Sequence, residues 1–234
     1  MSARAKRATV GTIGLVAVIS GVLFGTFPGI VANAEPAAAG QLPVLNELQK
    51  LTASDAAEGD QFGSAVSVSG DWAIVGAPFD DGEQTDSGSA YVLRRDDNGT
   101  PANPNDDTWI QEAKLTAPDA AEGDRFGISV SIDSGRVIVG APGDDHAGDG
   151  SGSAHVFRHV GGSWIHETKL VASDSGGGDW FGGSVCLRSD RIVVGAPFDS
   201  DISTYGGSVY VFRDDGLSWV EQQELLASDG ALGD

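Results

Sequence analysis

Aspartate residues recur in this chain at fixed intervals, and carboxylates are the residues here that are best suited to chemistry. They form three columns when the repeated segments are aligned: Asp55, Asp119, Asp174 and Asp229; Asp60, Asp124, Asp179 and Asp234; Asp80, Asp144 and Asp199. Carboxylate oxygens are the ligands that Ca²⁺ prefers, and two carboxyl groups at a suitable separation can hydrolyse a glycosidic bond. The columns therefore suggest two kinds of chemistry, metal binding and acid–base catalysis.

The repetition itself argues against catalysis. An active site is normally a unique constellation of residues, whereas these acids recur in every copy and so indicate a role in construction. The four histidines, His146, His155, His159 and His166, have no metal-ligand spacing with cysteine or with paired acids. The chain also contains no Gly-x-Ser-x-Gly nucleophile motif and no phosphate-binding glycine loop. We therefore expect a protein that is not an enzyme.

A motif of two parts accompanies the acids and occurs three times. Phe-Gly is followed by Gly-Ala-Pro, and the two parts begin 14 residues apart in each copy. The motif residues are Phe62, Gly63, Gly76, Ala77, Pro78, Phe126, Gly127, Gly140, Ala141, Pro142, Phe181, Gly182, Gly195, Ala196 and Pro197. A repeat this regular predicts an array of small β units.

Each copy contains four segments with the character of β-strands. In the first copy, residues 62–68 alternate bulky and tiny side chains, and residues 72–77 are apolar throughout, as in a strand buried on both faces. Residues 89–93 follow, and residues 109–115 alternate apolar and polar side chains, as in an outer strand. Cys186 falls at the position of Ser67 and Ser131, where we expect a small packed residue.

This order, buried first and half-exposed last, is typical of a propeller blade. We predict an all-β fold: a partial β-propeller of about three four-stranded antiparallel blades in an open arc, plus one extra N-terminal strand near residues 45–51. The blades are expected at residues 60–116, 124–171 and 179–227, within an array that covers residues 44–234. Known propellers have about four to eight blades. We therefore expect a chain that is truncated at its C-terminus or that completes its ring by self-association with another copy.

The N-terminal residues have the features of an export signal. Arg4, Lys6 and Arg7 precede an apolar run over residues 10–31, and a small-x-small cleavage site follows at residues 32–34. We expect a signal peptide at residues 1–34, helical or disordered, and a linker at residues 35–43. The prediction is a secreted or cell-surface protein with no membrane segment beyond this signal. The alternative is a protein anchored by an uncleaved N-terminal segment.

The chain is strongly acidic, with a formal net charge of −20. Removal of the signal would take this charge to −23, because the signal carries three basic residues and no acid. Such a surface repels the phosphates of nucleic acids, so we expect no nucleic-acid partner. The single cysteine excludes an internal disulfide.

The acids of the second and third columns should gather at one end of the propeller. In an antiparallel blade, the entry to the first strand and the exit from the second lie at the same end. Since close carboxylates repel unless a cation or donors intervene, one hypothesis is a rim that binds Ca²⁺ weakly. The other is that these aspartates accept backbone N–H bonds in turns, and no cofactor is then required. The metal ligands under the first hypothesis are Asp80, Asp81, Asp144, Asp145, Asp149, Asp199 and Asp201.

The order of Phe-Gly, a hairpin, Gly-Ala-Pro, an acidic loop and Gly-Ser-Ala-Tyr-Val resembles the FG-GAP repeat. This repeat is the blade unit of integrin α-subunit propellers, and the likeness is closest to its short bacterial form over residues 44–234. The family's calcium loop is replaced here by a tight turn at residues 69–71, so that site is not carried over.

The resemblance implies a binding or adhesion module. It would present its acidic rim loops to a protein or polysaccharide that the sequence does not identify. The alternatives are an interaction scaffold, a part of a larger exported protein, or an exported hydrolase.

Overall fold

The computed structural model describes residues 18–19, 22–23, 47, 49–200 and 206–227. The chain divides into two units, Met1–Asn46 and Glu47–Asp234. In the first unit, strand β1 (Val18–Ile19) pairs antiparallel with β2 (Val22–Leu23). These four residues are therefore extended, which corrects the expected helical or disordered conformation there. The rest of the expected signal and the linker at 35–43 lie outside the described residues.

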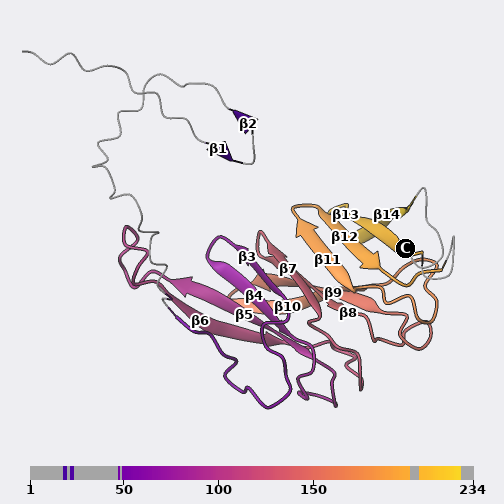
Figure 1. The fold of residues 1–234 in the computed structure, drawn as a ribbon, viewed down its shortest axis with the longest axis horizontal. Helices are drawn as coiled ribbons and strands as arrows, with labels where there is room; N and C mark the ends of the chain where they lie inside the picture. The colour runs from indigo at the N-terminus through magenta and orange to yellow at the C-terminus, as the bar shows by residue number, and fades with distance from the viewer. Residues whose placement is uncertain (1–17, 20–21, 24–46, 48, 201–205, 228–234) are drawn as a thin grey trace, which may run out of the picture. The chain divides into compact units, whose positions relative to one another are not determined.

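The second unit contains three four-stranded antiparallel sheets, each with its strands in chain order (Figure 1). Strands β3 (Val66–Ser69), β4 (Trp72–Ala77), β5 (Ser89–Asp96) and β6 (Thr108–Leu115) form blade 1. Strands β7 (Ser129–Asp133), β8 (Arg136–Ala141), β9 (Ser153–Val160) and β10 (Ser163–Leu170) form blade 2. Strands β11 (Ser184–Arg188), β12 (Arg191–Ala196), β13 (Ser208–Asp214) and β14 (Trp219–Leu226) form blade 3. These sheets confirm the prediction of an all-β partial propeller with three blades.

The first strand of each blade lies at the inner side of the array. Strand β7 packs beside both β3 and β11, which belong to the two neighbouring blades. Serine side chains join these strands, because Ile132 N–H donates to Ser67 Oγ at 3.2 Å and Leu187 N–H donates to Ser131 Oγ at 3.0 Å. The tiny residues of the alternating pattern thus allow inner strands to approach closely.

Two apolar cores lie between successive blades. Ile74 and Val92 of blade 1 pack with Phe126 and Val137 of blade 2, and all four side chains are fully buried. The second core joins blades 2 and 3 in the same way. Each sheet is therefore stabilised mainly by burial against its neighbours.

The expected N-terminal strand near residues 45–51 is not a strand at the residues described there, which are 47 and 49–51. The Gln49 side chain contacts β6 instead: Trp109 N–H donates to Gln49 Oε1 at 2.8 Å, and Gln49 Nε2 donates to Trp109 C=O at 3.1 Å. The Gln49 side chain thus makes hydrogen bonds to the Trp109 backbone groups that a neighbouring strand would otherwise pair with. None of the described residues forms a helix of the length and apolar character needed to cross a bilayer.

Candidate functional site at the Phe-Gly end of the blades

The residues of the Phe-Gly and Gly-Ala-Pro motif hold the blades together. Phe126 and Phe181 are fully buried between blades, whereas Phe62 is half-buried at the first face of the array. A Cβ atom on Gly76 would overlap the carbonyl oxygen of Gly127 in the next blade, and Gly140 has the same relation to Gly182. Glycine is thus required because two backbones meet there. The motif supplies structure, and the ligand-type side chains are those of the loops around it.

In blade 1, acids from two columns meet around one tyrosine and one lysine. The Tyr91 hydroxyl lies 2.6 Å from Asp80 Oδ2 and 2.9 Å from Asp55 Oδ1. Lys114 Nζ lies 2.6 Å from Asp55 Oδ2 and 2.9 Å from Asp80 Oδ1, and Ser89 Oγ also donates to Asp80. Burial acts to raise the pKa of Asp80, but the bonds from Tyr91 and Lys114 outweigh it and lower that pKa. Asp80 is therefore a charged, buried and fully partnered carboxylate.

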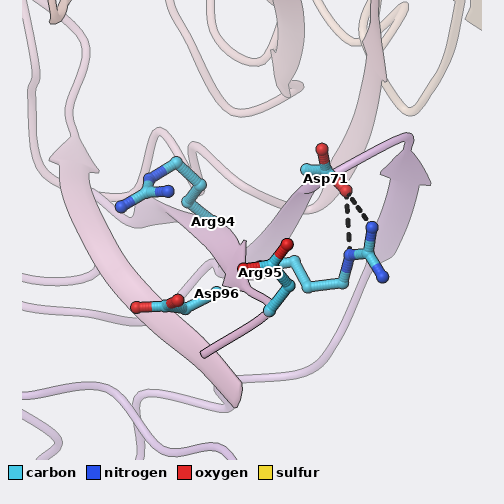
Figure 2. Close-up of a pocket in the computed structure, with 5 residues that line it drawn as sticks. Asp71, Arg94, Arg95 and Asp96 are labelled. Carbon is cyan, nitrogen blue, oxygen red and sulfur yellow. Dashed lines mark hydrogen bonds and ion pairs between the residues drawn. The ribbon is translucent and has the colours of Figure 1, made fainter. Parts of the chain in front are cut away.

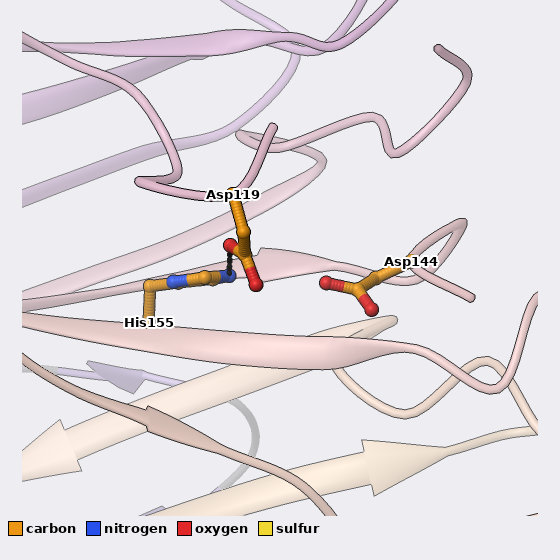
Figure 3. Close-up of side chains that lie close together, drawn as sticks. All are labelled: Asp119, Asp144 and His155. Carbon is orange, nitrogen blue, oxygen red and sulfur yellow. Dashed lines mark ion pairs between the residues drawn. The ribbon is translucent and has the colours of Figure 1, made fainter. Parts of the chain in front are cut away.

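Blade 2 builds the same cluster with a histidine in place of the tyrosine (Figure 3). Asp119, Asp144 and His155 offer ligand-type atoms within 4.8 Å of one another, the kind of grouping that could hold a metal ion. Lys169 Nζ lies 2.7 Å from Asp119 Oδ2 and 2.6 Å from Asp144 Oδ2. Burial lowers the pKa of His155 to about 4, so this imidazole is neutral at pH 7, and its Nδ1 lies 3.2 Å from His166 Nε2.

Blade 3 repeats the tyrosine but replaces the lysine with an acid. The Tyr210 hydroxyl lies 2.7 Å from Asp199 Oδ2 and 2.9 Å from Asp174 Oδ1. Glu224 pairs with Tyr210 across the strands, as Lys114 pairs with Tyr91 and Lys169 with His155. Ser208 Oγ donates to Glu224 Oε1 at 2.9 Å. The third cluster thus carries three carboxylates on the scaffold that elsewhere holds two carboxylates and an ammonium.

The remaining column caps the loops that lead into each blade. The N–H groups of Ala57, Ala121 and Gly176 donate to Asp60, Asp124 and Asp179 at 2.6, 2.7 and 2.6 Å. Burial raises the pKa of Asp124 to about 6. These carboxylates have the turn-capping contacts that the second hypothesis describes.

The aspartates proposed as calcium ligands are spread over different environments. Asp81 and Asp145 each accept a backbone N–H within their own loop, from Asp86 at 2.9 Å and from Gly150 at 2.8 Å. Asp149 is exposed, and Asp201 lies outside the described residues.

A calcium ion in blade 1 or blade 2 would need the carboxylate oxygens that Lys114 and Lys169 now contact. At Asp80 and Asp144 the lysine ammonium groups therefore compete with Ca²⁺, which takes six to eight oxygen ligands. The binding of calcium by the rim as a whole stays a prediction.

The same end of the blades carries an aromatic group that the sequence analysis did not identify. Arg125 Cζ lies 5.7 Å from the ring centroids of both Phe79 and Trp180, and Trp180 meets Phe198 edge-to-face at 5.0 Å. Trp180 and Phe198 are 36% and 39% exposed. A Cβ on Gly150 would lie 3.3 Å from Trp180 Nε1, so the loop that carries Asp145 and Asp149 passes beside this indole.

The sequence signal that could have identified this aromatic group is the residue before each Phe-Gly pair, which varies although the motif beside it is constant. Gln61, Arg125 and Trp180 precede the three Phe-Gly pairs, and all three have a positive φ, from 54° to 59°. The backbone conformation before Phe-Gly is therefore the same in each copy, whereas the side chain at that position differs.

The opposite end of blade 1 holds a small polar pocket of about 180 Å³, lined by Asp71 and residues 94–97 (Figure 2). Arg95 Nε lies 2.8 Å from Asp71 Oδ1, and Arg95 Nη1 lies 2.8 Å from Asp107 Oδ2. Because both carboxylates already neutralise this guanidinium, the pocket is a weaker candidate than the Phe-Gly end.

The sequence pattern of a family described as FG-GAP repeat matches this chain three times, at residues 45–93, 109–157 and 164–212. The second match, for example, contains the outer strand of blade 1 and the first three strands of blade 2. No curated protein matches the chain.

Proposed function

The chain belongs to the FG-GAP repeat family, whose repeats generally form binding and adhesion modules, and on this basis we propose that it is a non-catalytic binding module outside the cell. It meets a protein or polysaccharide ligand through the loops at the Phe-Gly end of its blades. Fold alone does not define a function, so the proposal depends on what these loops present.

One observation carries the proposal: the exposed aromatic pair Trp180 and Phe198 lies beside an acidic loop. Exposed aromatic rings contribute much of the energy at interfaces, since they bury a large apolar area at a low cost in side-chain entropy. The neighbouring acids Asp145 and Asp149 are exposed and give the surface its negative charge. Such a surface suits a polysaccharide that stacks on the rings or a protein that brings basic residues.

The polar clusters support a role without catalysis. His155, the one imidazole within a group of acids among the described residues, is fully buried and cannot meet a substrate. Asp80 and Asp144 are also buried and each contacts a lysine, so neither is free to act as a general acid or base.

Export rests on the basic start, apolar run and small-x-small site of residues 1–34. We propose a secreted or cell-surface location, with the uncleaved anchor as its alternative. Sequencing the N-terminus of the protein recovered from the medium and from the cell envelope distinguishes the two forms.

The test measures binding to panels of cell-wall polysaccharides and extracellular matrix proteins. We expect saturable binding to at least one polymer, and Trp180→Ala should weaken it by about tenfold or more. Trp180→Phe should retain most of the affinity. Leu217→Ala, which changes an exposed residue in the β13–β14 hairpin, is the matched control and should bind as the unchanged protein does.

The variants must have the same melting temperature as the unchanged protein, so that a loss of affinity is not caused by a loss of folding. Saturable binding that Trp180→Ala leaves intact would place the ligand elsewhere and reject this surface. A protein that binds no polymer saturably would favour the alternative roles, an interaction scaffold or a part of a larger exported protein.

A further inference from the structure

Blade 3 carries a groove that is filled on the other two blades. It has a volume of about 490 Å³ and is lined by Ser184, Gly195, Gly207, Val209 and Leu225, among others. No residue in the described part of the chain covers it. The equivalent glycines of blade 1, Gly76 and Gly88, lie directly against Phe126 and Gly127 of the next blade.

The contacts that fill these grooves are the same at both internal junctions. Phe126 N–H donates to Ser87 C=O at 2.9 Å, and Phe181 N–H donates to Ser151 C=O at 3.1 Å. Parallel bridges join Gly88 to Phe126 and Gly152 to Phe181. In blade 2, Ser129 Oγ also donates to Gly182 C=O at 2.7 Å. At both internal junctions, one blade therefore holds the backbone and the phenyl ring of the next blade's Phe-Gly unit.

Blade 3 keeps every part of this receptor. Gly206 stands where Ser87 and Ser151 stand, Ser184 stands where Ser129 stands, and both line the open groove. Val209 and Leu225 replace Ala154 and Leu170 of the blade 2 core. The carbonyl, the hydroxyl and the apolar wall are all present for one more Phe-Gly unit.

The other half of such a junction lies on blade 1. Val66 and Val68 are 69% and 66% exposed, whereas their counterparts Val130 and Ile132 in blade 2 are 8% and 4% exposed. Among the described residues, no group accepts a hydrogen bond from Phe62 N–H. Within the described residues, the ligand face of blade 1 and the receptor face of blade 3 are therefore both uncovered.

We propose that two copies of this chain bind head to tail, with Phe62-Gly63 of each copy seated in the blade 3 groove of the other. The argument is continuity with the two internal junctions, whose two faces are the ones left uncovered. Counted from the described blades alone, two copies bring together six blades, which is within the four to eight of closed propellers, and three copies would bring together nine. A contact between two different faces forms a ring when the rotation between copies completes a full turn, and a ring of two copies then contains two identical junctions.

The accessibility of the Cys186 thiol can be used to detect this junction. It is the chain's only cysteine and is exposed, although Ser67 and Ser131, at the same position, accept hydrogen bonds from the next blade. Its exposure corrects the expectation of a packed side chain, because the described residues include no blade beyond it. In the head-to-tail dimer, Cys186 would face Val68 of the other copy, as Ser67 faces Ile132.

The test uses the chain expressed with its own N-terminal segment. We expect light scattering on a sizing column to give twice the mass of one chain, and maleimide to modify Cys186 more slowly as the protein concentration rises. Val66→Asp with Val68→Asp should give a monomer with fast modification. Leu225→Asp on the groove should also give a monomer, while Leu217→Asp, on an exposed hairpin, should stay dimeric.

Mixing the two face variants tests whether the copies bind head to tail. Each face variant keeps one intact face, so a mixture of the blade 1 variant and the Leu225→Asp variant should recover a dimer held by a single junction. The proposal is overturned if the unchanged chain is a monomer at every concentration. It is also overturned if the mixture stays monomeric while both variants melt as the unchanged fold does, or if Leu225→Asp alone remains dimeric.

Discussion

At the scale of single residues, one cluster is built three times with different side chains. Tyr91, His155 and Tyr210 occupy the same position, and each contacts the phenylalanine of its own Phe-Gly pair. The tyrosines stay protonated, since burial and two carboxylates raise their pKa far above the ordinary value. The histidine differs because its pKa is lowered by burial to about 4. Only blade 2 is thus sensitive to mild acid through this position.

His155→Tyr should make the protein more resistant to mild acid. An unfolded histidine has a pKa of about 6.5, so His155 contributes stability above that pH and loses it as the pH falls toward 4. Linkage gives a loss of about 2 kcal/mol between pH 7 and pH 5 for this group. The tyrosine does not titrate in this range. Denaturant unfolding at both pH values should therefore show the unchanged protein losing about 2 kcal/mol more than the variant.

Other groups with shifted pKa values, among them Asp124, His166 and Asp179, are present in both proteins. The raised pKa of Asp124 stabilises the fold as the pH falls below about 6, and the lowered pKa of His166 acts in the opposite direction. His146→Gln, at an exposed site in the loop of blade 2, serves as the control and should keep the behaviour of the unchanged protein. An equal loss of stability in His155→Tyr would contradict the prediction.

At the scale of elements, the sequence repeat that the family pattern matches does not begin and end where a blade does. The second family match includes β6 of blade 1 together with β7, β8 and β9 of blade 2. The glycines of Gly-Ala-Pro sit where one blade's second strand meets the next blade's Phe-Gly. The three equivalent glycines should therefore differ in importance according to whether a blade follows them.

Gly140→Ala should destabilise the protein by more than about 3 kcal/mol, whereas Gly195→Ala should cost about 1 kcal/mol. A Cβ on Gly140 overlaps the backbone carbonyl of Gly182, which cannot move without separating blades 2 and 3. On Gly195 the nearest atom is the side-chain oxygen of Ser184, which can rotate away. Urea unfolding in the Leu225→Asp background, where the groove is not used by a second copy, gives both values. Similar losses for the two variants would contradict the prediction.

At the scale of the whole molecule, charge dominates. The chain has 34 acidic and 14 basic residues and a net charge of −20. Like charges repel one another in the compact state, so ions that screen them stabilise it. In blades 1 and 2 this repulsion is relieved locally by Lys114 and Lys169, which contact the buried carboxylates of Asp80 and Asp144.

Calcium should therefore act on stability as a screening ion. We expect equal concentrations of CaCl₂ and MgCl₂ to raise the melting temperature by the same few degrees, and a chelator to reverse both effects. Calorimetry should give no saturable heat with Ca²⁺ at millimolar concentration. A shift that is specific to calcium would support the rim hypothesis, and testing Asp149→Asn and Asp201→Asn would then locate the ion.

The sequence determined most of the fold because its signals are local and repeated. The spacing of Phe62, Gly76 and Pro78, found again in two more copies, was enough to predict three four-stranded sheets and their inner-to-outer order. Alternation of side chains within a strand and the turns between strands are properties of neighbouring residues, so they can be recognised without coordinates.

Tertiary structure decided which side chains meet although they lie far apart along the chain. The pairing of Lys114 with Asp55 and Asp80 joins positions 59 and 34 residues apart, and no local pattern reports such a contact. The contact of Trp180 with Arg125 likewise depends on how blade 3 packs on blade 2. A carboxylate that the sequence presents as a metal ligand can thus be an ion-pair partner, because its distance to a cation is set by packing and not by spacing along the chain.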